Sequence, residues 1–257
     1  MGNGVRCRGA RTGRLRAELS LFFDAAHALG CSHRRRPIGG FGAAEVFSFH
    51  ATKVASAGEG GAITTNDAEL AHRLRLMRNF GFAGYDTITE LGTNGKMSEL
   101  AAAFGITSLE SLGEFIAANR RNYIRYVRDL DGIPGIELRR YDEAEQSNYH
   151  YIVIEVSPGE AAGRVRDELA AVLHAENVLA RRYFSPGCHR APPYFQDSDE
   201  ARAPLARTED LCSRVLALPT GTAVGEAEID SICSILRVVV ENAGELHERL
   251  TGSGLPL

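Results

Sequence analysis

The stretch VFSFHATKVASAGEGGAITT, Val46–Thr65, decides the fold of this chain. Alternating apolar and aromatic residues over Ala44–Ala51 predict a β-strand, and GGAITT predicts a second strand after a glycine-rich loop. Between the two strands lies Lys53. The chain holds 29 Lys plus Arg, yet its only other lysine is Lys96. Arginine is the default cation here, so position 53 calls for something that only lysine can do.

Lys53 has the surroundings of a reactive amine. It follows a predicted strand and precedes Gly58, Gly60 and Gly61, which permit sharp turns and close backbone approach. A partly desolvated ammonium group gives up its proton more readily than one in water, and the free amine attacks aldehydes. The guanidinium group of arginine stays protonated and cannot do this. The alternative is an ordinary surface lysine.

Asp24 supports the chemical interpretation. LSLFFDAAHALG, Leu19–Gly30, predicts a short strand that ends at Asp24. If this strand lies parallel to the strand before Lys53, both residues meet at one edge of the sheet. A carboxylate near a reactive lysine is what pyridoxal phosphate (PLP) chemistry requires, because it keeps the pyridine nitrogen protonated. Otherwise, Asp24 is a helix cap.

The rest of the chain alternates between helix and strand patterns, which indicates an α/β or α+β class. Asn66 or Asp67 is expected to cap a helix. Further helices are expected from Ser98 to Leu112, after Gly113 to Leu130, over 161–177, and after Arg207 and Glu226; strands are expected near 136–141, over Tyr149–Val156 and over Val178–Phe184.

Composition narrows the class of protein. The 257 residues are 44% hydrophobic, which is enough for a sizeable core, and the net charge of -4 gives no reason to expect a nucleic-acid partner. No apolar run approaches the roughly 18 residues of a membrane helix. Five cysteines form no CxxC pair, so neither a disulfide framework nor a metal site is expected. A reducing cytoplasm is the expected location.

Several motifs, in order and at consistent spacing from about Leu15 to Arg249, resemble the DegT/StrS-type sugar aminotransferases. The resemblance is nearest to members that aminate nucleotide-activated 4-keto-6-deoxysugars in antibiotic pathways. The motifs are DAAHALG (Asp24–Gly30), SFHATK (Ser48–Lys53), GEGGAITT (Gly58–Thr65), GTNGKMSELAAAFG (Gly92–Gly105), RRYFSPGCH (Arg181–His189) and LALPTGTAV (Leu216–Val224).

The resemblance implies an α/β fold, the PLP-dependent transferase fold type I of the aspartate aminotransferase kind. It implies a basic leader or stub over residues 1–20 and the remaining part of a large PLP-binding domain over 21–115. A small C-terminal domain would then occupy 116–257. An amino acid, expected to be glutamate, would give its amine to the cofactor, and a nucleotide-diphosphate keto sugar would receive it.

The resemblance also implies roles for single residues. Lys53 would be the Schiff-base lysine and the base that moves a proton between substrate and cofactor. Asp24 would pair with the pyridine nitrogen, His27 would lie near the ring hydroxyl or stack on the ring, and Ser48 would bind the phosphate. Asn94 would reach the phosphate of the partner subunit, so the active site would be shared in a homodimer. Tyr183 and His189 would line the sugar site.

The sequence departs from the family before DAAH. The family places a phosphate-binding loop and a ring-stacking aromatic residue upstream, and the first twenty residues match neither. We therefore expect an incomplete cofactor site with weak or no affinity for PLP. We also expect a sheet edge and face that stay exposed unless another chain covers them.

Four alternatives remain. A non-catalytic relic or regulatory member would keep the fold without turnover. A sugar dehydratase of the same family would place histidine where Lys53 stands, so Lys53 argues against it. Cys188 and His189 suggest a Cys/His hydrolase only by adjacency. GEGGA does not match the dinucleotide-binding pattern of an oxidoreductase, because a strand follows it and not a helix.

Overall fold

The computed structural model describes residues 19–158, 162–192 and 205–253. These residues form two compact units. The first comprises the described residues up to Ala117 together with Tyr141–His150, and the second comprises Ala118–Arg140 and the described residues from Tyr151 onward. Tyr141–His150 therefore belongs to the first unit, although it follows the opening segment of the second. The domain limits at 21–115 and 116–257 remain a proposal from the sequence.

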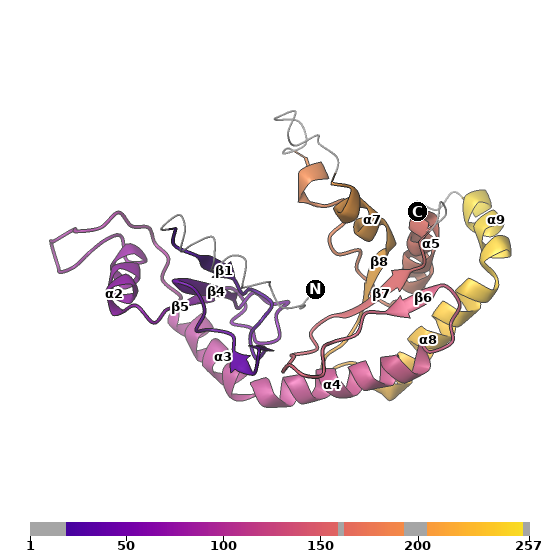
Figure 1. Ribbon diagram of the computed structural model, residues 1–257, viewed down its shortest axis with the longest axis horizontal. Coiled ribbons are helices and arrows are strands. Elements are labelled where there is room, and N and C mark those ends of the chain that lie inside the picture. Colours follow the sequence, from indigo (N-terminus) through magenta and orange to yellow (C-terminus); the bar gives the residue numbers. More distant parts are fainter. Residues whose placement is uncertain (1–18, 159–161, 193–204, 254–257) are drawn as a thin grey trace. The chain divides into compact units, whose positions relative to one another are not determined.

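The first unit contains a three-stranded sheet in the order β1-β4-β5 (Figure 1). Its strands are β1 (Phe22–Asp24), β4 (Ala44–Ser48) and β5 (Gly61–Thr64). β1 runs parallel to β4, and β4 runs antiparallel to β5. A short hairpin of β2 (Ser32–His33) and β3 (Arg36–Pro37) connects β1 to β4. The three strands expected around Asp24 and Lys53 are confirmed.

The two faces of this sheet differ in exposure. Phe47 is 5% exposed, whereas Phe22, Val46 and Ile63 are 55%, 44% and 50% exposed. Val46 and Ile63 are register partners, so they share one face of the sheet. The structure therefore leaves an apolar sheet face open to solvent, as the sequence led us to expect.

The helices of the first unit are α2 (Ala68–Met77), α3 (Glu99–Glu110) and the start of α4 (Leu112–Asp129). The first two begin at the expected caps. The Asp67 carboxylate accepts from the Glu69 and Leu70 backbone N–H groups, and the Ser98 hydroxyl accepts from Ala101. α4 begins at Leu112, whereas the sequence placed its start after Gly113.

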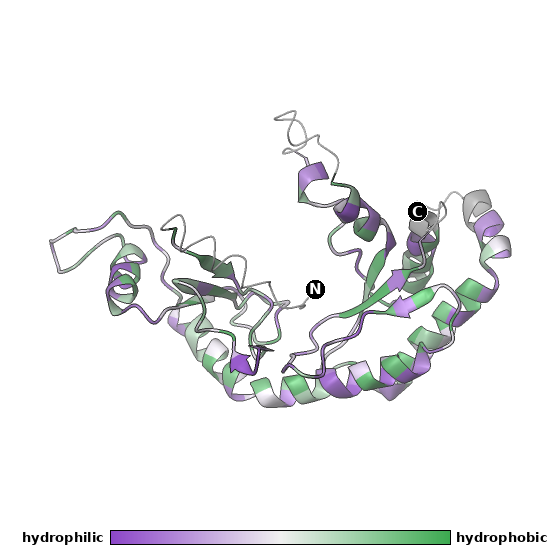
Figure 2. Ribbon diagram, in the orientation of Figure 1, coloured by the Kyte–Doolittle hydropathy of each residue, from purple (hydrophilic) through white to green (hydrophobic). Residues whose placement is uncertain are grey.

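The second unit contains an antiparallel sheet in the order β6-β7-β8. Every residue of β8 is apolar and buried, and Figure 2 shows this strand in green. The strands are β6 (Ile136–Leu138), β7 (Ile152–Val156) and β8 (Val215–Leu218). The helices are α5 (Ala162–Ala175), the 3-10 turn η1 (Cys188–Arg190), α7 (Ala206–Arg214), α8 (Glu226–Glu241) and α9 (Ala243–Ser253).

The core of the second unit lies between this sheet and its helices, with α5 packed against α7, α8 and α9. The Tyr126 hydroxyl reaches from α4 to the Pro219 carbonyl at 3.0 Å. The largest fully buried side chains of this core are Tyr126, Ile152, Ile154, Leu169, Leu173, Leu216, Ile229 and Leu236.

Three strand predictions were too long. The strand expected over Ala44–Ala51 ends at Ser48. Tyr149–Tyr151 precede β7, because Tyr149 has a positive φ of 49° and the Ser147 and Asn148 side chains accept from the backbone N–H groups of Tyr149 and His150. Such local bonds compete with a sheet ladder. Val178–Phe184 forms only a single bridge, Arg181 to Ala217.

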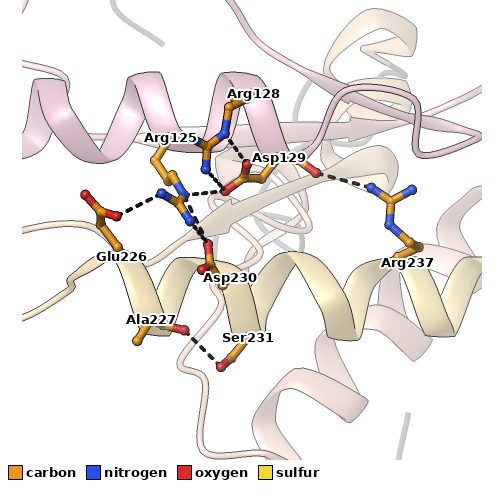
Figure 3. A network of polar contacts seen from close by, with 8 residues as sticks. All are labelled: Arg125, Arg128, Asp129, Glu226, Ala227, Asp230, Ser231 and Arg237. Atoms are coloured by element: carbon orange, nitrogen blue, oxygen red, sulfur yellow. Dashed lines mark hydrogen bonds and ion pairs between the residues drawn. The ribbon is translucent and has the colours of Figure 1, made fainter.

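An ion-pair network joins α4 to α8 (Figure 3). The Arg125 guanidinium contacts Asp129 at 2.6 Å and Glu226 at 2.8 Å, and also binds Asp230. Hydrogen bonds from Arg128 and Arg125 hold the pKa of Asp129 below its usual range. Glu226 and Asp230 are exposed, so this network adds little to stability compared with the apolar core.

Among the described residues, no single helix is long and apolar enough to cross a membrane; α3 and α4 reach that length and apolar character only as a pair that is bent between Glu110 and Leu112.

The core of α8 gives a stability prediction. Leu236 is 0% exposed and Val238, on the same helix, is 57% exposed. We expect Leu236→Ala to lower the free energy of unfolding by about 2–5 kcal/mol, because it leaves a cavity. Val238→Ala should change it by no more than about 0.5 kcal/mol. Urea unfolding followed by circular dichroism measures both, and equal effects would contradict this account of the core.

Candidate functional site

The parallel pairing of β1 with β4 builds the site. Asp24 is the last residue of β1 and lies opposite Val46, and Ser48 ends β4 two residues later. Parallel strands end at the same edge of a sheet, so Asp24, Ser48 and the chain leaving β4 emerge together. The expectation that Asp24 and Lys53 share one sheet edge is confirmed.

Lys53 sits in a turn directly after β4. The turn closes with a hydrogen bond from the Lys53 N–H to the His50 carbonyl at 2.9 Å. The chain then returns beside Phe49, whose N–H donates to Gly60 and whose carbonyl accepts from Ala57. These bonds thus hold Lys53 at the edge of the sheet.

Helix α3 supports the far side of the lysine loop. The Ser56 N–H donates to the Ser108 hydroxyl at 3.0 Å. A Cβ added at Gly105 would lie 3.2 Å from the Ala57 Cβ, so glycine permits this close approach. The loop is therefore fixed by packing as well as by its own turn.

The amine of Lys53 meets His27. Nζ of Lys53 lies 2.9 Å from Nε2 of His27, and both side chains are partly buried. Burial and then the charge of Lys53 lower the pKa of His27, while Asp24 opposes the shift. The ring is therefore neutral at neutral pH, and an unprotonated Nε2 can accept a hydrogen bond from the lysine.

Asp24 and Ser48 lie at this edge of the sheet, and each side chain accepts one hydrogen bond from the backbone. The Asp24 Oδ1 atom accepts from the Ala26 N–H at 3.0 Å, and the residue is exposed. The Ser48 hydroxyl accepts from the His50 N–H at 3.3 Å. Both groups keep further hydrogen-bonding capacity, since a carboxylate accepts several bonds and a hydroxyl can also donate.

His150 joins the cluster from a distant part of the sequence, and sequence reasoning missed it. Burial lowers its pKa to about 4; a hydrogen bond to the Thr52 backbone opposes the shift, and the charges of His27 and Lys53 add to it. The one available signal was a polar residue at the start of the strongest strand pattern, YHYIVIEV.

The other residues expected in the site belong to other segments of the chain. Asn94 is on a separate loop of the first unit, in an isolated bridge with Asn79. Tyr183 and His189 belong to the second unit. Tyr183 stacks on Phe184 with ring centroids 4.7 Å apart, and the His189 Nε2 atom lies 3.1 Å from Glu209. Their roles toward phosphate and sugar remain predictions.

In the described parts of the chain, no three His, Cys, Asp or Glu side chains are grouped so that they could hold a metal ion.

A family profile described as the DegT/DnrJ/EryC1/StrS aminotransferase family matches residues 14–237. The chain belongs to this family. It is 34% identical over 221 residues to the dTDP-4-amino-4,6-dideoxy-D-glucose transaminase of Shigella dysenteriae, covering 86% of this chain and 59% of that protein. It is 32% identical to the GDP-perosamine synthase of Caulobacter vibrioides, covering 88% of this chain and 60% of that protein.

Solved structures of family members have the same fold. The structure of DesI in the presence of its TDP-sugar product superimposes with a TM-score of 0.87 at 45% identity, over 96% of this chain and 62% of that one. The expected fold class, PLP-dependent transferase fold type I, is confirmed. The chain spans about six-tenths of the length of the relatives it matches.

His150 gives a pH prediction. The unfolded chain protonates this ring near its ordinary pKa, whereas the folded chain does so only near pH 4. The free energy of unfolding should therefore fall as the pH drops between these values, by up to about 1.4 kcal/mol per pH unit, and stay level above them. His150→Gln should remove this part of the slope.

Urea unfolding of both proteins between about pH 4 and 7 measures the effect. His72→Gln, at an exposed histidine on α2, is the matched control and should keep the wild-type slope. Parallel curves for wild type and His150→Gln would contradict the account.

Proposed function

We propose that this chain carries the catalytic lysine of a PLP-dependent sugar-nucleotide aminotransferase. The observation that carries the proposal is the 2.9 Å contact between Lys53 and His27 at the sheet edge where Asp24 also ends. Family membership supplies the reaction class, since the family is one of aminotransferases.

The residues at this edge fit PLP. When bound, PLP supplies an aldehyde for an amine and a ring that takes up electrons from the substrate carbon. The structure offers an amine at Lys53, an exposed carboxylate at Asp24 for the ring nitrogen, and a hydroxyl at Ser48 for the phosphate. His27 lies beside the amine and would flank the ring.

Lys53 would carry out the proton transfer. Its Nζ atom can accept a proton from the carbon that bears the amine and return it to a neighbouring atom, provided that the amine is unprotonated at that moment. A neutral His27 at 2.9 Å can hold the amine in position without adding a second charge. Asp24 contributes a fixed negative charge where the ring nitrogen would lie.

The relatives indicate the substrate class. The Shigella protein is named a transaminase of dTDP-4-amino-4,6-dideoxy-D-glucose, and the Caulobacter protein a GDP-perosamine synthase. We therefore propose a nucleotide-diphosphate keto sugar as amine acceptor and an amino acid, glutamate, as donor. We also propose a homodimer in which Asn94 serves the partner's phosphate, with Tyr183 and His189 at the sugar.

Trapping the cofactor tests the lysine. We expect borohydride, added to the protein saturated with PLP, to fix the label on the peptide that contains Lys53, because that amine is held at the site. Mass spectrometry of the digest locates it. Lys96→Arg should keep the label and Lys53→Arg should lose it. A label on Lys96, or none, would overturn the proposal and favour the non-catalytic relic.

Asp24→Asn tests the carboxylate. Asparagine keeps an oxygen acceptor for the Ala26 N–H but removes the charge, so the turn should survive. We expect affinity for PLP to fall about tenfold to a hundredfold, the worth of a charged hydrogen bond. Absorbance titration measures this. Asp67→Asn, at the exposed cap of α2, is the matched control, and an equal loss in both would count against the role of Asp24.

A further inference from the structure

The segment 145–150 lies along the loop that carries His27, although more than a hundred residues separate them in sequence. The Ser32 N–H donates to the Gln146 carbonyl at 2.9 Å, and the Gln146 N–H donates to the Ser32 hydroxyl at 2.8 Å. The Glu145 carboxylate accepts from the Ser32 hydroxyl at 2.6 Å and from the Arg35 N–H at 3.1 Å. Segment and loop are thus tied together at several points.

Asn148 is the centre of this contact. It is 4% exposed, and its Nδ2 atom donates to two backbone carbonyls, those of His27 at 3.0 Å and Leu29 at 2.9 Å. Its Oδ1 atom accepts from the His150 N–H at 3.1 Å. The two polar atoms of this buried amide therefore link two segments: the nitrogen binds the His27 loop, and the oxygen binds the backbone of His150.

These bonds fix the backbone on which the imidazole of His27 is mounted. The same residue whose carbonyl is held by Asn148 places Nε2 at 2.9 Å from Nζ of Lys53. Without the amide, two partly buried carbonyls would lose this donor, and the loop would shift to regain hydrogen bonds. The contact between His27 and Lys53 depends on this loop position.

We propose that Asn148 is a positioning residue: it holds the His27 loop so that the imidazole contacts the amine of Lys53, and it also fixes the backbone at His150. The inference rests on the proposed function, because it concerns how the reacting lysine is oriented.

Exchange of the histidine C2 hydrogen in heavy water, followed by mass spectrometry of each histidine peptide, tests the proposal on the full chain without PLP. Among the residues that the structure describes, the charged or titratable groups that act on His27 or are acted on by it are Lys53, Asp24 and His150. Burial and Lys53 lower the pKa of His27, so a loosened loop should raise it. We expect Asn148→Ala to raise the midpoint for His27 by about half a pH unit or more.

Asn122 offers a matched control in the second unit. It is 6% exposed, and its Nδ2 atom also donates twice, to the Thr220 hydroxyl at 3.3 Å and the Gly221 carbonyl at 3.0 Å. Asn122→Ala removes a similar buried amide and should leave the His27 midpoint unchanged. The serine hydroxyl of Asn148→Ser can still donate one bond, so this variant should shift the His27 midpoint by less than Asn148→Ala does. It replaces the alanine variant in the experiment if that variant does not fold.

An unchanged His27 midpoint in folded Asn148 variants would overturn the proposal, as would an equal shift in Asn122→Ala. The readout needs neither cofactor nor turnover. A failed PLP label with a shifted His27 midpoint would therefore reject the proposed function alone, and the reverse result would reject the role of Asn148 alone.

Discussion

The parallel alignment of β1 with β4 is the constraint on which the site depends. Because the two strands run in the same direction, Asp24 and the turn that carries Lys53 leave the sheet at one edge. An antiparallel pairing would send them to opposite edges and separate the carboxylate from the amine. The neighbouring pair, β4 with β5, is antiparallel and only returns the chain to α2. The pairing of β1 with β4 therefore positions Asp24 and Lys53, and the pairing of β4 with β5 completes the sheet.

Around the amine of Lys53 the protein gathers two imidazoles, those of His27 and His150, whose pKa values are both lowered, chiefly by burial. Neutral rings can accept or donate hydrogen bonds without adding charge beside the lysine, and the exposed Asp24 supplies the opposite charge nearby. This combination suits an amine that must exchange protons during a reaction. Elements far apart in sequence meet here, because the segment Tyr141–His150 belongs to the first unit.

Much of this could be predicted from local sequence. A short apolar run located β1, alternation located β4, and flanking glycines marked β5. The caps Asp67 and Ser98 marked two helices, and the rarity of lysine singled out Lys53. Those features depend on residues that are close together in the chain. Asn148 was missed because it acts through tertiary hydrogen bonds to the His27 and Leu29 carbonyls, and His150 was missed because its ring bonds the distant Thr52 backbone. No local pattern encodes such contacts.

The over-long strand predictions fail for a related reason. Tyr149 belongs to an apolar run that favours a strand, but the Ser147 and Asn148 side chains bond the backbone and turn it instead. Val178–Phe184 has strand composition, yet only Arg181 forms a β-bridge. Pro186, which lacks an N–H, and Gly187, with a φ of 93°, follow it. Propensity decided neither case; the available hydrogen-bond partners did.

A crystal structure of the protein grown with PLP tests the central claim most directly. The account predicts continuous density from Nζ of Lys53 to the aldehyde carbon of the ring, with an Asp24 oxygen within about 3 Å of the ring nitrogen. Density for the ring at another lysine, or a ring nitrogen that faces away from Asp24, would contradict it.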